Sequence, residues 1–251
     1  MEEKHRRFLE SIQNSIRDTV PKEKIGVAFS GGVDSTLLAK ICHDMRYDVV
    51  LLTIGFPNSH DVLFAKEINE QLGYSHKILE IDSDSFSKIS TKIKERIQTE
   101  NLSWNENGIA FYYVSKLAHS LGIKTVVTAN GIDELFCGYN AYREAIEKGN
   151  HYVLKLMASK LENEKKMMRA VNAVTSEFDV KLIQPFLSED FVSYANTIPI
   201  TEKIKDKDDL YRKHIIRSLA KEIGVPTISS EKRKKALQYG SNIHKALIKS
   251  R

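Results

Sequence analysis

The hydrophobic pattern of the chain is strand-like in the first half and helical in the second. Four short runs rich in β-branched residues are nearly all apolar, as in strands buried on both faces of a parallel sheet: residues 25–30, 48–56, 76–81 and 124–130. Between these runs, apolar residues recur at helical spacing over 37–45, 61–72 and 86–121. This alternation predicts an α/β fold with a doubly wound, mostly parallel sheet.

Helical patterns also flank the alternating region. Phe8, Ile12 and Ile16 have helical spacing and predict a helix within residues 1–20, which ends before Pro21. Beyond Tyr139 the strand signal nearly vanishes, and helices are predicted over 141–162, 164–178, 189–196, 208–223 and 230–249. We therefore expect an N-terminal helix over 1–20, an α/β core over 21–140 and a helical C-terminal subdomain over 141–251.

The composition favours a globular, cytoplasmic protein. The chain has 251 residues, of which 41% are hydrophobic, and this is enough to bury a core. The charged stretch at residues 1–7 is followed by no long apolar run, so we expect neither a signal peptide nor a membrane span. Cys42 and Cys137 lack the paired spacing of a zinc site and are expected to be reduced thiols.

The positive charge of the chain is concentrated at its C-terminal end. The net charge is +5, and residues 201–251 carry 14 Lys and Arg against 6 Asp and Glu. A solvated helical face accounts for such a surplus, and a partner rich in phosphate is the alternative.

The stretch FSGGVDST, residues 29–36, is the strongest candidate for a binding site. It follows the first predicted strand and precedes the first predicted helix, where open α/β sheets bind ligands and helix N–H groups attract anions. Its glycines allow the backbone to approach a ligand closely, and its hydroxyl groups add donors for phosphate oxygens: Ser30, Gly31, Gly32, Ser35 and Thr36. The alternative is a glycine turn that merely starts a helix.

Asp34 indicates which kind of phosphate ligand the loop binds. A carboxylate would repel a bare phosphate, but it fits a Mg²⁺ ion that the phosphates share. The loop is not a Walker A motif, because no lysine precedes Ser35. The residues therefore predict a metal–phosphate complex.

The segment SGGVDST after an apolar strand resembles the pyrophosphate loop of the PP-loop ATP pyrophosphatases, also called adenine nucleotide alpha hydrolase-like proteins. Members of that superfamily cleave ATP between its α and β phosphates and adenylate a substrate oxygen. A nitrogen or sulfur nucleophile then displaces AMP. The loop by itself does not select among the members.

Four further stretches are similar to the synthetase domain of asparagine synthetases. They are IGFPNSHDVLFAKEINEQLGYSHKI at 54–78, NGIDELFCGY at 130–139, IQPFLSEDFVSYA at 183–195 and EKRKKALQYGS at 231–241. Together they extend the resemblance over roughly residues 20–245. It includes the synthetase part and not that family's glutaminase domain.

The resemblance and the residue pattern together name the candidate site. Asp133 follows the strand predicted at 124–130, so it should reach the same edge of the sheet as Asp34, and the two would hold Mg²⁺. Asp133 as a simple helix cap is the alternative. The resemblance implies that Lys235 is a catalytic cation near the α-phosphate, and that the adenine of ATP lies against the backbone of Ile54 and Gly55.

The resemblance implies an ATP-dependent carbon–nitrogen ligase with ATP and Mg²⁺ as cofactors. It would adenylate a carboxylate, with aspartate as the first candidate, and ammonia or an amine would then attack. Glutamine-dependent relatives carry a nucleophilic cysteine directly after Met1, whereas this chain has Glu2. We therefore expect free ammonia, ammonia from a separate glutaminase subunit, or an amine of the substrate as the nitrogen source.

Several residues differ from the family pattern around the acceptor. Asn130 stands where these synthetases carry a glutamate that acts in amide formation, and an amide cannot serve as a general base. Ser188 replaces an aspartate, Lys181 lies where an acid is expected, and Cys137 replaces a glycine. The acceptor pocket is thus expected to differ more than the ATP pocket.

Two other functions remain open on sequence alone. A PP-loop enzyme that thiolates or aminates tRNA would explain the basic C-terminal region, although no second cysteine accompanies Cys137 as a sulfur carrier. A non-catalytic nucleotide-binding subunit is the other alternative, and Asp34, Asp133 and Lys235 argue against it. A homo-oligomer is an open possibility for the assembly.

Overall fold

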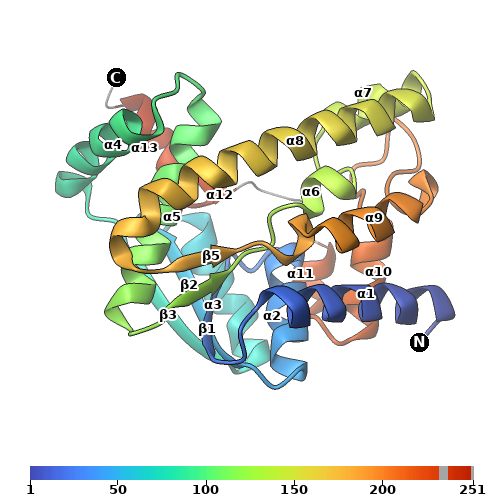
Figure 1. Ribbon diagram of the computed structural model, residues 1–251, viewed down its shortest axis with the longest axis horizontal. Helices are drawn as coiled ribbons and strands as arrows, with labels where there is room; N and C mark the ends of the chain where they lie inside the picture. The colour runs from blue at the N-terminus through green and yellow to red at the C-terminus, as the bar shows by residue number, and fades with distance from the viewer. Residues whose placement is uncertain (232–236, 250–251) are drawn as a thin grey trace.

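The computed structural model describes residues 1–231 and 237–249, and a five-stranded parallel sheet runs through it (Figure 1). The strands are β1 Lys24–Ala28, β2 Asp48–Gly55, β3 Ser75–Glu80, β4 Thr125–Val127 and β5 Lys181–Ile183. Their spatial order is β3-β2-β1-β4-β5, and every neighbouring pair is parallel. The predicted α/β fold with a parallel sheet is therefore confirmed.

The strand order changes direction at β1. Val27 of β1 lies beside Leu51 of β2 on one side and beside Val127 of β4 on the other. The connections that follow β1 and β4 consequently leave the sheet next to each other. Such a switch point opens a crevice at the carboxyl ends of the strands.

Helices cover both faces of the sheet (Figure 1). One hydrophobic core includes Val27 and Leu51 with residues of several helices, among them α1 Glu3–Thr19, α2 Val33–Asp44, α3 His60–Leu72, α9 Glu189–Thr197 and α10 His214–Glu222. The other core includes Leu52 and Val126 with residues of four helices: α4 Ser83–Ile97, α5 Leu102–Ser120, α8 Asn150–Thr175 and α13 Ile243–Lys249. Adjacent residues such as Leu51 and Leu52 face opposite layers because side chains alternate along a strand.

Short helices complete the chain between these layers. The α-helical ones are α6 Ile132–Leu135, α7 Ala141–Glu147, α11 Thr227–Glu231 and α12 Leu237–Gly240. Three 3₁₀ turns lie at η1 Ser176–Phe178, η2 Pro185–Leu187 and η3 Ile200–Glu202. A small third core surrounds Tyr142, which is fully buried and whose hydroxyl donates to the Glu134 carbonyl at 2.7 Å.

The structure corrects several expected elements of the second half. The helix predicted over 230–249 is interrupted, because α12 ends at Gly240 and α13 begins at Ile243. The strand β5 was not predicted, because three residues are too few to show a strand pattern. Helix α8 runs through residue 163 without the expected break, and the chain turns instead at Gly149, which has a φ of 111°. Helix α10 begins only at His214, because Arg212 and Lys213 adopt left-handed backbone conformations.

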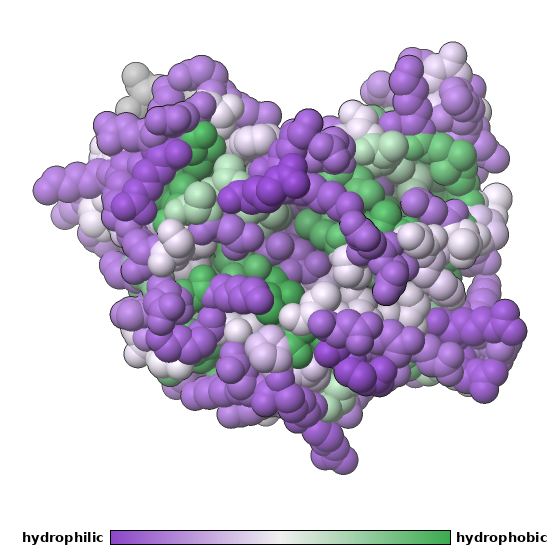
Figure 2. All heavy atoms as spheres, in the orientation of Figure 1, coloured by the Kyte–Doolittle hydropathy of each residue, from purple (hydrophilic) through white to green (hydrophobic). Residues whose placement is uncertain are grey.

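The visible surface is mainly hydrophilic, and apolar residues show between the projecting polar side chains (Figure 2). Exposed large hydrophobic side chains include Leu63 on α3 and Ile248 on α13. Within residues 1–231 and 237–249, none of the helices has the length and apolar character needed to cross a bilayer.

Candidate active site

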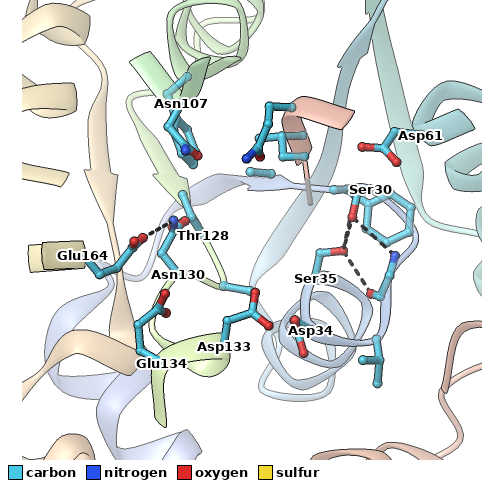
Figure 3. Close-up of a pocket in the computed structure, with 18 of the residues that line it drawn as sticks. Ser30, Asp34, Ser35, Asp61, Asn107, Thr128, Asn130, Asp133, Glu134 and Glu164 are labelled. Atoms are coloured by element: carbon cyan, nitrogen blue, oxygen red, sulfur yellow. Dashed lines mark hydrogen bonds between the residues drawn. The ribbon is translucent and has the colours of Figure 1, made fainter. Parts of the chain in front are cut away.

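A cavity of about 540 Å³ opens where the chain leaves the carboxyl ends of β1 and β4. Its walls come from the connections after these two strands and from helices α3, α5, α6, α8 and α10 (Figure 3). Ser30 and Asp34 lie at one side of this cavity, and Asn130 and Glu164 lie at the other. The predicted phosphate loop and the predicted acceptor region therefore share one space.

The loop between β1 and α2 has the shape expected of a phosphate cradle. Gly31 has a left-handed φ of 75°, and a Cβ at this position would meet the Phe64 carbonyl oxygen at 3.0 Å. The backbone conformation and the closeness of α3 both require glycine here. Gly32 directly precedes the first residue of α2, so the N–H groups of this helix begin at the cavity.

Hydroxyl groups hold the phosphate loop in this shape. Ser35 Oγ donates to the Gly32 carbonyl at 3.1 Å and lies 3.4 Å from Ser30 Oγ (Figure 3). Ser30 and Ser35 line the cavity, whereas Thr36 is buried and its Oγ1 donates to the Gly32 carbonyl at 2.9 Å. Ser229 of α11 also donates to the Gly31 carbonyl at 2.7 Å, so the C-terminal helices support the loop.

Two carboxylates meet at one buried lysine in the middle of the cavity. Lys213 Nζ lies 2.5 Å from Asp34 Oδ2 and 2.6 Å from Asp133 Oδ1. The sequence argument places Asp34 and Asp133 at one edge of the sheet, and the structure brings them to the same ammonium group. The other oxygen of Asp34, Oδ1, is buried and accepts no hydrogen bond from the residues that the structure describes.

Lys213 is held in place by its surroundings. Its side chain is 2% exposed, and its left-handed backbone, with a φ of 54°, directs it inward just before α10. Burial lowers the pKa of Lys213, and the charge of Asp34 opposes this shift. Gly138 packs so closely that an added Cβ would lie 1.8 Å from Asp133 Oδ1 and 2.7 Å from Lys213 Cε.

Buried acidic residues lie on the acceptor side of the cavity. Glu134 of α6 accepts from the Gly131 N–H at 3.2 Å and from the Tyr139 hydroxyl. Burial, and secondly the charge of Glu164, raise the pKa of Glu134 to about 7. Burial also raises the pKa of Glu164, while its hydrogen bond from Asn130 acts in the other direction.

Comparison with known proteins agrees with this geometry. The family model described as asparagine synthase matches residues 7–178 and 147–250. The chain belongs to the asparagine synthase family. Proteins of this family use ATP to form amides.

Relatives of known name are similar over most of this chain. "Putative asparagine synthetase 1 (glutamine-hydrolyzing)" of Methanocaldococcus jannaschii is 27% identical over 95% of this chain and 50% of its own length. Asparagine synthetase 1 (glutamine-hydrolyzing) of Arabidopsis thaliana is 25% identical over 84% of this chain and 38% of its own length. The chain thus spans half or less of the length of these asparagine synthase relatives.

A solved structure of another enzyme shares the fold. NMN synthetase from Francisella tularensis superposes with a TM-score of 0.51 and 14% identity, covering 94% of this chain and 75% of that protein. At this identity the likeness concerns the fold alone, and it agrees with the α/β architecture with a parallel sheet.

The remaining predicted site residues are placed as follows. Ile54 lines the cavity, and Gly55 packs against protein, since a Cβ there would meet Ser59 Oγ at 2.4 Å. Gly31, Thr36 and Gly55 are not part of the cavity wall. Lys235 lies outside the described residues.

The departures from the asparagine synthase pattern have different structural settings. Asn130 lines the cavity, whereas Lys181 in β5 and Ser188 at the start of α9 do not. Ser188 Oγ caps α9 by accepting from the Phe191 N–H at 3.4 Å. Cys137 is buried in a left-handed conformation with a φ of 59°, which explains why the family pattern has glycine at this position.

The residues present fit a Mg²⁺ ion that is shared with a nucleotide. Mg²⁺ is usually held by one or two carboxylates together with phosphate oxygens, and Asp34 and Asp133 supply two carboxylates beside the phosphate loop. No group of three or more His, Cys, Asp or Glu side chains within the described ranges is arranged to hold a metal.

Lys213 and Glu164 are among the cavity residues that the sequence patterns do not identify. Lys213 lies within the helix predicted over 208–223, next to other polar residues, where a lysine is usually solvated. Glu164 follows Asn163 on α8 and has the same type as exposed Glu162 two positions earlier. No local pattern separates these residues from surface charges, because only the tertiary contacts do so.

Proposed function

We propose that this chain adenylates a carboxylate substrate with ATP and then converts the acyl adenylate into an amide. The observation that carries the proposal is the meeting of Asp34 and Asp133 at Lys213 beside the phosphate loop, within 2.5 and 2.6 Å. A loop that bound only a phosphate anion would gain nothing from two carboxylates. Membership of an ATP-dependent, amide-forming family supports the same reaction.

In this proposal the two terminal phosphates of ATP lie on the loop after β1. The residues predicted from the sequence either line the cavity at this loop or hold the loop in shape: Ser30, Gly31, Gly32, Ser35 and Thr36. Asp34 and Asp133 would hold Mg²⁺, which supplies charge neutralisation to the pyrophosphate leaving group. The adenine would lie against the second strand near Ile54, and Gly55 lets α3 approach that strand.

Cations of the C-terminal part would stabilise the charge that develops on pyrophosphate. We assign this role to Lys213, which is buried and already lies at Asp34, and to Lys235, which lies outside the described residues. Arg217 of α10 lines the same cavity. Positive groups in a water-poor site stabilise such charge more strongly than they would in water.

The acceptor would occupy the side of the cavity formed by α5, α6 and α8. This side offers amide and hydroxyl groups and the cation Lys160, whose Nζ lies 5.3 Å from the centre of the Tyr139 ring. A small polar carboxylate fits such a lining, and aspartate is our first candidate. Ammonia would be the nitrogen source, free or delivered by a separate glutaminase subunit.

The test is to supply the purified protein with Mg-ATP, ammonium and a panel of carboxylates, and to measure AMP and pyrophosphate. Asp34→Asn should reduce AMP release at least about a hundredfold, because a proposed ligand of the metal is lost. Asp44→Asn is the matched control, because Asp44 is on the same helix and pairs with Lys40 at the surface. Formation of ADP and orthophosphate, or equal activity of both variants, would contradict the proposal.

A further inference from the structure

The side chain of Asn130 forms hydrogen bonds that link the loop after β4 to helix α8. Its Nδ2 donates to Glu164 Oε1 at 2.6 Å, and its Oδ1 accepts from Thr128 Oγ1 at 2.7 Å (Figure 3). Both polar ends of the amide are therefore engaged, and its orientation is fixed. Asn130 also occupies the position at which the family resemblance implies a glutamate.

Glu164 brings a carboxylate to the place where Asn130 lacks one. It lines the same cavity as Asp34 and is 6% exposed. Within the described residues, it forms no ion pair with a lysine, arginine or histidine, although several such residues line this cavity. A buried carboxylate without a cation is costly, and a proton or a cationic ligand relieves this cost.

Burial of Glu164 also favours its taking up a proton. Burial raises the pKa of Glu164 above that of a solvated glutamate, and the hydrogen bond from Asn130 opposes this shift. A carboxylate with a raised pKa is a better proton acceptor near neutral pH than a solvated one. The Tyr139 hydroxyl donates a hydrogen bond to Glu134, whereas the Asn130 amide donates one to Glu164. Asn130 therefore orients the carboxylate of Glu164.

We propose that Glu164 is the catalytic base of amide formation and that Asn130 is its positioning residue. The inference rests on the proposed function. The nitrogen lone pair forms a bond to the acyl carbon, and the bond from this carbon to the phosphate oxygen breaks, with its electron pair leaving on AMP. One N–H proton of the nucleophile moves to an oxygen of Glu164. In this proposal the base comes from α8 and not from the connection after β4.

The experiment separates the two half reactions. Adenylation is measured as carboxylate-dependent exchange of labelled pyrophosphate into ATP without an amine, and amide formation is measured with ammonium. Glu164→Gln keeps the size of the side chain and its bond to Asn130, so exchange should stay within about threefold. Amide formation should fall about a hundredfold or more, which is typical for loss of a general base.

Two further measurements distinguish a base from a structural residue. Adding Asn130→Glu to Glu164→Gln returns a carboxylate to the signature position and should restore at least a tenth of the rate of amide formation. Hydroxylamine is largely unprotonated at neutral pH, so Glu164→Gln should be less defective with hydroxylamine than with ammonium. Glu162→Gln on the exposed side of α8 is the control and should match the wild type.

Each outcome has a definite meaning. Wild-type amide formation in Glu164→Gln, or equal losses of exchange and amide formation, would overturn the inference while leaving the proposed function intact. No recovery on adding Asn130→Glu, together with equal defects for both nucleophiles, would overturn it as well. Absence of carboxylate-dependent exchange in the wild-type protein would overturn the proposed function, and the inference with it.

Discussion

Lys213 Nζ lies 2.5 Å from Oδ2 of Asp34, although the two residues are 179 positions apart in the sequence. The lysine enters from the segment before α10, and the aspartate from the first turn of α2. This ion pair joins the C-terminal part of the chain to the phosphate loop. Because Asp133 contacts the same ammonium group at 2.6 Å, one lysine pairs with two partly buried carboxylates.

Replacing Lys213 with methionine should destabilise the protein strongly. The substitution leaves Asp34 and Asp133 without their common countercharge, and removal of one partner from a buried pair costs about 3–5 kcal/mol. Lys221→Met on α10 breaks an exposed pair with Glu231 and should cost about 1 kcal/mol or less. Urea unfolding of the two variants measures the difference, and equal midpoints would contradict a stabilising role of Lys213.

Gly138→Ala should impair adenylation more than it impairs folding. The new methyl group would displace the Asp133 carboxylate or the end of Lys213, and misplacement of reacting groups by about 1 Å can cost about a hundredfold in rate. Gly122→Ala is the control, because Gly122 has a φ of 69° and open space around it. This control should cost stability by about 1 kcal/mol and leave AMP release unchanged. A fully active Gly138→Ala would show that Asp133 need not stay in place.

Helix α1 should be an integral part of the core. Ile12 of α1 is fully buried in the core that α1 shares with the sheet. Ile12→Ala should therefore lower the free energy of unfolding by about 2–5 kcal/mol. Ile248→Ala makes the same change at a half-exposed position of α13 and should cost about 0.5 kcal/mol. Thermal or urea unfolding would compare them. A small effect of Ile12→Ala would mean that α1 contributes little to the stability of the domain.

The stability of the protein should depend on pH through Glu134. Burial and Glu164 raise the pKa of Glu134 to about 7 in the folded chain, from an ordinary value of 4.5. The folded state therefore binds more protons than the unfolded state between these values, and this contribution is complete below pH 4.5 and lost as pH rises through 7. Glu134→Gln should weaken the fall in unfolding free energy over this range. Exposed Glu144→Gln should leave it unchanged, and equal slopes in all three proteins would contradict the shift.

Sequence patterns were informative where a residue's role follows from its neighbours in the chain. The strands β1, β2 and β4 consist mainly of buried apolar residues, whereas β3 at the edge of the sheet is polar at Ser75, Lys77 and Glu80 and is not buried as expected. A glycine pair after β1 marks the phosphate loop. The sequence predicts that Asp34 and Asp133 lie at the same edge of the sheet, because each follows a predicted strand at its carboxyl end. Their contact with one ammonium group confirms that the two connections lie side by side.

The features that sequence could not show depend on contacts between distant segments. Lys213 faces inward only because two left-handed residues turn the chain before α10, and neither Arg212 nor Lys213 is a residue type that signals such a turn. Glu164 differs from exposed Glu162 only in the helix face that packs toward Asn130. The strand β5 is too short for a recognisable period and forms because β4 offers it an edge.

The central claim is that the carboxylate of the substrate attacks the α-phosphorus of ATP. Oxygen-18 placed in the carboxylate of the substrate that supports AMP release tests this claim most directly, with mass spectrometry of the phosphorus products. If the chain forms an acyl adenylate, one labelled oxygen is found in AMP and none in pyrophosphate. Label in orthophosphate, together with ADP as the nucleotide product, would contradict the account.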